Sequence, residues 1–214
     1  MKIFDLTHVI QPDMPMYPGT EQPILHATFT HATHGFYERK LTMFSHTGTH
    51  MDAPAHILDG GNTLDTFEAD FFYGKGCVVD CTAEGKADGG LIGLDRLAGY
   101  EGELRQADFV LLRTDWNRFW RDERYFSGFP VLTPEAAMWL AQTGLRGLGV
   151  DAISVDTMDT EDYPVHKAIL GSNAVIIENL TNLGALPTGE FMFSCFPLKM
   201  VDADGSPVRA VAMA

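Results

Sequence analysis

The chain has 214 residues, of which 45% are hydrophobic and 21% are charged. This length suits a single domain with a substantial buried core, and the composition is ordinary for a globular protein. The formal net charge of −14 argues against nucleic acid as a partner, because phosphate binding requires a basic surface. The same charge gives no reason to expect an anionic membrane as a partner.

The N-terminal residues do not resemble a signal peptide, because Asp5 precedes any apolar segment that could form one. No apolar run approaches the roughly 18–20 residues that a membrane-spanning helix requires. The three cysteines form neither a Cys-x-x-Cys motif nor an even set for disulfides. These features predict a reduced, cytoplasmic protein.

The first part of the chain is dominated by predicted strands. Residues 5–10 predict a strand that ends in the proline-rich loop 11–19. Residues 25–30 and 37–44 alternate apolar and polar side chains, a pattern typical of two half-buried antiparallel strands.

The middle of the chain combines buried strands with helices. The apolar runs 76–81 and 109–113 predict strands, and residues 91–97 between them predict a short helix. The strongest helix signal covers residues 133–141, where Thr133 is a good N-cap and a proline occupies the first helical position.

The last third repeats this alternation and then ends in a hairpin. Residues 148–150 and 174–178 predict strands, and residues 164–171 predict a helix. Residues 191–200 and 208–213 predict a hairpin. Hairpins at both ends and helices between central strands indicate one α/β domain over the whole chain, built as a mixed sheet with packed helices.

One histidine-rich segment concentrates the residues that can carry chemistry. His46, His50, Asp52 and His56 fall within eleven positions of a chain with only eight histidines. Imidazole and carboxylate groups are the ligands of zinc or manganese in hydrolytic sites. An extended segment would hold His46 and His50 about 13 Å apart, so the chain must curl for them to share a metal, and Gly48 permits the curl.

The histidines of the chain also have interpretations that involve no metal. Polar residues on a solvated loop are the alternative to a metal site, but chance is a poor explanation for so dense a cluster. His31 and His34 also have ligand-like spacing, yet no acidic residue lies beside them, which favours a surface pair at a turn. His8 and His26 are expected to be partly buried strand residues.

The sequence of residues 46–56, HTGTHMDAPAH, resembles the signature HxGTHxDxPxH of the cyclase family of metal-dependent hydrolases. This family includes bacterial kynurenine formamidases and isatin hydrolase. Because further matches occur in order along most of the chain, the resemblance implies the family's swivelling β/β/α fold for residues 1–214. These matches are Asp5-Leu6-Thr7, Tyr17-Pro18-Gly19, Leu148-Gly149-Val150-Asp151, Ser154-Val155-Asp156, His166 with Ala168-Ile169-Leu170, Glu178-Asn179-Leu180 and Pro197-Leu198-Lys199.

The resemblance also implies a role for individual residues. His46, His50 and Asp52 would bind a first metal, and Asp52 would bridge to a second. His166 and Glu178, spaced by twelve residues as in the family, would complete the second site, with Glu178 bridging. His56 would move protons between water and the leaving group. The cofactor would be one or two ions of Zn²⁺ or Mn²⁺ per chain, which activate the attacking water.

The implied reaction is hydrolysis of a C–N bond in a small-molecule amide or cyclic amide. We expect an arylformamidase of the kynurenine formamidase type, active in tryptophan catabolism, in a homo-oligomer (a dimer or tetramer). Kynurenine formamidases carry a tryptophan before the Pro-Gly of the first loop, where this chain has Tyr17. The aromatic face of Tyr17 can still stack on an aryl substrate.

Several alternatives stay open. An isatin-hydrolase type of enzyme would open a cyclic amide or lactone, but that enzyme has a neutral amide in the place of Glu178 and holds one metal. A non-catalytic metal-binding protein would close its site with four protein ligands, whereas this set leaves an open position and supplies His56 as a spare base. Residues 115–126, rich in aromatics and arginines, would either cover the substrate or dock into the core or a subunit interface.

Overall fold

The computed structural model describes residues 1–82, 90–187 and 189–214. Among these residues the main sheet has nine strands, of which the central β5, β7, β9 and β10 run parallel while the flanking strands pair antiparallel. In order across the sheet, the strands are β1 (Ile3–Asp5), β13 (Val211–Met213), β11 (Phe191–Ser194), β5 (Tyr73–Asp80), β7 (Phe109–Arg113), β9 (Gly147–Val150), β10 (Val175–Glu178), β4 (His50–Asp52) and β12 (Gly205–Pro207). The predicted α/β class with a mixed sheet is confirmed.

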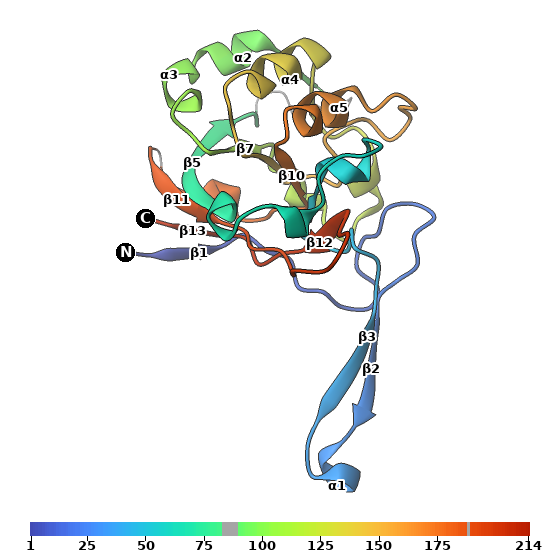
Figure 1. Ribbon diagram of the computed structural model, residues 1–214. Coiled ribbons are helices and arrows are strands. Elements are labelled where there is room, and N and C mark those ends of the chain that lie inside the picture. The colour runs from blue at the N-terminus through green and yellow to red at the C-terminus, as the bar shows by residue number, and fades with distance from the viewer. Residues whose placement is uncertain (83–89, 188) are drawn as a thin grey trace.

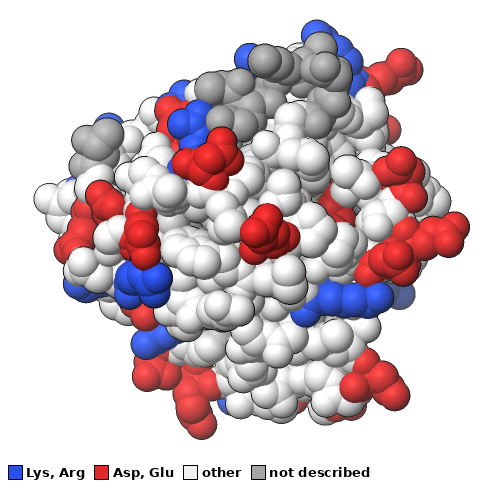
Figure 2. All heavy atoms as spheres, turned by 90° about the horizontal axis from the view of Figure 1, so that it is seen from above, with Lys and Arg blue, Asp and Glu red and all other residues white. Residues whose placement is uncertain are grey.

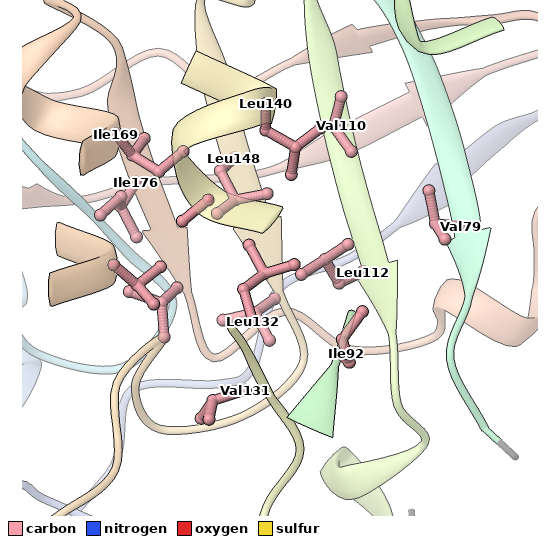
Figure 3. Close-up of a cluster of buried hydrophobic side chains, with 14 of the residues drawn as sticks. Val79, Ile92, Val110, Leu112, Val131, Leu132, Leu140, Leu148, Ile169 and Ile176 are labelled. Carbon is pink, nitrogen blue, oxygen red and sulfur yellow. The ribbon is translucent and has the colours of Figure 1, made fainter. Parts of the chain in front are cut away.

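Helices cover one face of the sheet, at the top of Figure 1. Val110, Leu148 and Ile176 of the sheet belong to a buried cluster with Leu140 and Ile169 of the helices (Figure 3). The helices on this face are α2 (Leu94–Ala98), α3 (Glu101–Leu104), α4 (Pro134–Ala141) and α5 (Pro164–Gly171). The predictions of α4 and α5 are confirmed, and the hydroxyl of the N-cap of α4, Thr133, accepts a hydrogen bond from the backbone N–H of Ala136 at 3.2 Å.

The opposite face of the sheet encloses a second core. Phe109, Leu111 and Ile177 of the central strands belong to it, together with Phe193 of β11 and Leu6 beyond β1. The central strands are therefore buried on both faces, which explains why they are continuous apolar runs in the sequence. The predicted antiparallel pairing near the C-terminus is confirmed, since β11 pairs with β13. The predicted tight hairpin is wrong, because β11 ends at Ser194 and residues 205–207 form β12 beside β4 before the chain returns to β13.

A long hairpin projects from the body of the molecule (Figure 1). It consists of β2 (Ile24–Phe29), the short helix α1 (His31–His34) and β3 (Glu38–Thr42), and we call residues 24–42 the arm. The predicted antiparallel pairing is confirmed, but the predicted half-burial is wrong, because every residue of β3 is exposed and so is His26. Alternation places apolar side chains on one face of a ribbon whether or not the same chain covers that face.

The first strand has a boundary different from the predicted one. The strand predicted over residues 5–10 ends at Asp5, because Leu6 turns into the second core and Thr7 bridges to Leu180 instead. His8 is half-buried as expected but lies outside the strands.

The helix predicted over residues 91–97 begins three residues later. Its first residues form β6 (Leu91–Ile92), which pairs in parallel with β8 (Val131–Leu132). Gly93 then separates this strand from α2. A two-residue strand has too short a pattern to be distinguished from the start of a helix.

Short 3₁₀ helices complete the chain: η1 (Pro54–His56), η2 (Leu64–Thr66), η3 (Ala69–Phe72), η4 (Trp116–Phe119), η5 (Glu123–Phe126) and η6 (Leu183–Ala185). In the described part of the chain, no helix combines the length and the apolar character needed to cross a bilayer. Figure 2 shows the helix-covered face, where acidic and basic side chains are both scattered among uncharged ones.

Candidate active site

The histidine-rich segment folds as a tight loop that leads into β4. Gly48 has a φ of +68°, in the left-handed region that glycine adopts without a steric penalty, so the chain curls there. β4 then pairs with β10, and the register places His50 opposite Glu178. Two segments far apart in the sequence therefore meet through the pairing of these strands.

Two groups of potential metal-ligating atoms share Asp52. His46, His50 and Asp52 form one group, Asp52, His166 and Glu178 form the other, and the atoms within each group lie within 4.8 Å of one another. The Nδ1 atom of His46 and the Nε2 atom of His50 lie 2.7 and 3.1 Å from Asp52 Oδ1. The Nε2 atom of His166 lies 3.8 Å from Asp52 Oδ2 and 3.5 Å from Glu178 Oε1. All five residues expected as ligands are thus brought together.

The chemistry of this cluster fits divalent cations. Asp52 is 1% exposed, and its Oδ2 atom is buried without a hydrogen-bond partner among the described residues. A buried, unpaired carboxylate oxygen is energetically costly, and a cation would compensate it. Imidazole nitrogens and carboxylate oxygens are ligands that both zinc and manganese accept.

Each histidine of the two groups has its second ring nitrogen held by an oxygen atom. Such partners fix the tautomer and the orientation of a ligating imidazole. The pairs are His46 Nε2 with Asp204 Oδ2 at 3.0 Å, His50 Nδ1 with the Gly48 carbonyl at 2.8 Å, and His166 Nδ1 with Asp156 Oδ2 at 2.7 Å. The nitrogen that faces the shared carboxylates is therefore left to accept a cation.

The carboxylates of the cluster shift the pKa values of the histidines. Burial lowers the pKa of His46, but neighbouring carboxylates, chiefly Asp52, outweigh burial and raise it to about 9. Burial also lowers the pKa of His166, and Asp156 and Glu178 outweigh it and raise the pKa to about 10. Burial acts to raise the pKa of Asp52, but the neighbouring histidines hold it well below its usual value.

His56 behaves differently from the other histidines of the motif. It belongs to neither group that contains Asp52 and lies instead with His46 and Asp204. Burial, opposed by Asp52 and assisted by His46 and His166, lowers the pKa of His56 to about 4. A neutral imidazole with a partly exposed side chain can accept a proton at neutral pH.

The cluster lies at a cavity of about 320 Å³. Tyr17, which is 43% exposed, lies on its wall together with Phe44 and Tyr163, and His56 also lines it. A larger hollow of about 570 Å³ lies along β5 and α3 and is lined by none of the expected ligands. The smaller cavity is therefore the one that combines an apolar wall with reactive groups.

Residues 115–126 dock into the core and do not form a free flap. Trp116 is 4% exposed and Tyr125 is fully buried, each in one of the 3₁₀ helices η4 and η5. Of the two interpretations left open by the sequence, the described residues support core docking.

Three residues that contact the ligand candidates had no role assigned from the sequence: Asp156 and Asn179, which were noted only as family matches, and Asp204, which was not noted at all. Asp204 lies in a turn 158 positions from His46, so no local pattern connects them. The glycine after it was a usable signal, because a Cβ atom on Gly205 would lie 2.5 Å from the His46 ring. Glycine is required for this close approach.

Comparisons with known proteins identify the family of the chain. The profile of the Cyclase family ("Putative cyclase") matches residues 4–157. The kynurenine formamidase of Erythrobacter litoralis (strain HTCC2594) is 32% identical over 211 residues, which cover 98% of this chain and 93% of that protein.

Solved structures of related hydrolases are also similar to this chain. An isatin hydrolase bound to the product analogue thioisatinate has a TM-score of 0.89 and 26% identity, covering 100% of this chain and 92% of that one. A structure described as a "predicted metal-dependent hydrolase from Bacillus stearothermophilus" has a TM-score of 0.80 and 30% identity, covering 99% and 97%. The chain therefore belongs to the cyclase family of metal-dependent hydrolases.

Proposed function

We propose that this enzyme hydrolyses the C–N bond of an N-formyl aryl amine, as an arylformamidase of the kynurenine formamidase type. The observation that carries the proposal is the pair of ligand groups sharing Asp52, beside the neutral His56, at one cavity with an aromatic wall. Kynurenine formamidase relatives at about 30% identity over nearly the whole chain support the substrate class.

The five ligand candidates would hold one or two divalent ions, Zn²⁺ or Mn²⁺. His46 and His50 would hold one ion, His166 would hold the other, and Asp52 and Glu178 would bridge, because each carboxylate faces histidines of both groups. Bound divalent ions polarise a carbonyl group and lower the pKa of water.

His56 would move the proton. Its imidazole would take a proton from the attacking water and deliver it to the nitrogen of the departing aryl amine, while formate is released. The low pKa of His56 supports the first half of this role, because the ring is neutral at pH 7. Tyr17 would stack on the aryl ring from the cavity wall.

A second candidate is hydrolysis of a cyclic amide or lactone, as in isatin hydrolase. The match of the whole chain to the isatin hydrolase structure supports it. Glu178 argues against it, because this carboxylate favours a second cation where the isatin enzyme has a neutral amide.

We also propose that the whole chain acts as one domain in a cytoplasmic homo-oligomer, a dimer or tetramer. The buried thiols of Cys77 and Cys195 are compatible with a reducing compartment. The arm supports a second copy as partner, since an isolated two-stranded hairpin is marginally stable in water and Leu41 on it is 53% exposed.

The two candidate reactions are separated by a hydrolysis screen. N-Formylkynurenine and N-formylaniline should be hydrolysed with a larger kcat/KM than isatin, and release of formate should match release of amine. The reverse preference would select the cyclic amide reaction, and turnover of neither class by the metal-loaded protein would overturn both.

Metal binding itself is tested by elemental analysis of the purified protein. We expect one or two divalent ions per chain, and Asp52→Ala should lose the most metal because this residue belongs to both ligand groups. Full metal occupancy in Asp52→Ala would contradict the assignment of ligands.

A further inference from the structure

A line of buried hydrogen bonds runs from Tyr125 to the metal-ligand candidate His50. The Tyr125 hydroxyl donates to Asn179 Oδ1 at 2.7 Å, and Asn179 Nδ2 donates to the Gly48 carbonyl at 3.0 Å. The same carbonyl accepts the hydrogen bond from His50 Nδ1 at 2.8 Å. Tyr125 is 0%, Asn179 5% and His50 4% exposed, so water cannot readily replace these bonds.

The direction of each bond follows from the donors and acceptors present. The Gly48 carbonyl only accepts, so the NH₂ group of Asn179 must face it, and the amide oxygen is then left for Tyr125. Burial raises the pKa of Tyr125 well above its usual value, so its hydroxyl keeps the proton that it donates. The two lone pairs of the Gly48 carbonyl are occupied by Asn179 and His50.

Tyr125 is itself anchored by other residues of the aromatic segment. Its backbone carbonyl accepts a hydrogen bond from Trp116 Nε1 at 3.3 Å, and its ring packs edge-on against Trp120 at a centroid distance of 5.1 Å. The line therefore ends in a segment that is docked into the core.

We propose that Tyr125 is a positioning residue for the metal site: acting through Asn179, it fixes the Gly48 carbonyl and thereby keeps the proton of His50 on Nδ1 and the lone pair of Nε2 toward Asp52. This proposal rests on the proposed function, in which His50 is a metal ligand. It gives the aromatic segment 115–126 a role in the site although none of its residues lines the cavity.

The first test is the affinity of the protein for Zn²⁺, measured by competition with a chromophoric chelator. Tyr125→Phe should weaken binding about tenfold, in the range observed when a partner of a ligating histidine is lost. Tyr100→Phe is the matched control, because its hydroxyl is bonded to the Asp80 N–H at 3.3 Å, outside the metal site, and its affinity should stay unchanged. Equal affinity of Tyr125→Phe and wild type would overturn the proposal.

The second test asks whether Tyr125 acts through Asn179. Asn179 has a φ of +57°, so Asn179→Gly keeps the backbone conformation while removing both hydrogen bonds. This variant should also bind Zn²⁺ about tenfold more weakly or worse, and adding Tyr125→Phe to it should cause little further loss. Equal losses from Tyr125→Phe in both backgrounds would show that the hydroxyl acts elsewhere.

A readout independent of metal excludes a general loss of structure. Burial lowers the pKa of His50, but Asp52 and Glu178 outweigh burial and raise it, so the spectra are recorded at a pH high enough to deprotonate the ring. Under these conditions ¹⁵N NMR of the metal-free protein should show His50 as the Nδ1–H tautomer in wild type and as a mixture in Tyr125→Phe, with similar melting temperatures. If Tyr125→Phe does not fold, Asn179→Gly alone decides, and unchanged Zn²⁺ affinity would overturn the proposal. If wild type binds no Zn²⁺, the proposed function fails as well, which is a separate outcome.

Discussion

At the scale of single residues, environment separates histidines that are identical in chemistry. His166 faces three carboxylates and has a raised pKa, whereas His56, four residues after Asp52, has a pKa lowered to about 4. The difference follows from the partners, because Asp156 holds one nitrogen of His166 at 2.7 Å, while the nearest carboxylate to a His56 nitrogen, Asp204, is 3.9 Å away. A sequence motif lists both as histidines and cannot express this difference.

His56→Ala should therefore separate proton transfer from metal binding. We expect its metal content and melting temperature to stay near those of wild type while kcat falls by roughly 10²–10⁴, the usual contribution of general acid–base catalysis. Elemental analysis and steady-state kinetics on an N-formyl aryl amine measure the two quantities, with His50→Ala as the control that loses metal. Comparable metal loss in both variants would make His56 a ligand.

Tyr17 is the residue whose replacement should change substrate preference. Stacking on an aryl ring contributes on the order of 0.5–1.5 kcal/mol beyond burial, so Tyr17→Ala should lower kcat/KM for aryl formamides by about tenfold or more. Small aliphatic formamides should be affected much less. Equal losses for both substrate classes would assign Tyr17 to loop structure, and faster N-formylkynurenine turnover by Tyr17→Trp would identify this position as a determinant of specificity.

At the scale of elements, the parallel strands deliver polar side chains to one edge of the sheet. Thr114 follows β7, Asp151 follows β9, and Glu178 ends β10. In open α/β sheets, bound molecules commonly lie at this edge, where the parallel strands have their carboxyl ends. The antiparallel strand β4 then adds His50 and Asp52 beside β10. Pairing of strands, and not proximity in sequence, assembles the site.

The assembly of the site by strand pairing explains which features could be predicted from the sequence and which could not. The central strands and α4 were predictable, because burial on both faces and helix caps leave local patterns. The ligand candidates were recognisable from the motif and its family. The contacts of Asn179 with the Gly48 carbonyl and of Asp204 with His46 were not, because the paired residues are 131 and 158 positions apart and such pairs leave no periodic or local signal.

Thr114→Val tests how much the hydrogen bond between Thr114 and Asp151 stabilises this edge of the sheet. The Thr114 hydroxyl donates to Asp151 Oδ1 at 2.5 Å, and Asp151 is fully buried. Removing a donor to a buried carboxylate should lower the free energy of unfolding by about 1–3 kcal/mol at pH 8. Chemical denaturation measures this change, and Thr143→Val, which removes a hydroxyl bonded to the Leu140 carbonyl, is the control.

The same variant should show a defined pH dependence. Burial raises the pKa of Asp151 to about 6, above its unfolded value of about 3.9, so the native carboxyl is protonated at pH 5 and ionised at pH 8. The lost hydrogen bond stabilises the ionised form, so the destabilisation by Thr114→Val should be larger at pH 8 than at pH 5. A loss that does not change with pH would place the effect in packing.

At the scale of the whole molecule, burial is distributed very unevenly. The body has two cores, one on each face of the sheet, while the arm exposes most of its residues. The arm leads directly into the histidine-rich loop, and Phe44, between the arm and His46, lines the cavity. A second copy packed on the arm would therefore lie close to the substrate.

Removing the arm should convert the proposed oligomer into a monomer. Leu25 pairs with Leu41, and paired Cα atoms lie about 5 Å apart, so an Asn-Gly turn can replace residues 26–40 without displacing the ends. Light scattering coupled to size-exclusion chromatography should report a monomer for this variant and an oligomer for wild type. Leu41→Ser should weaken assembly, whereas Met138→Ser on α4, with the same 53% exposure, should not. Metal content should persist, since no ligand candidate is removed, and an unchanged oligomer in the shortened chain would place the subunit contact elsewhere.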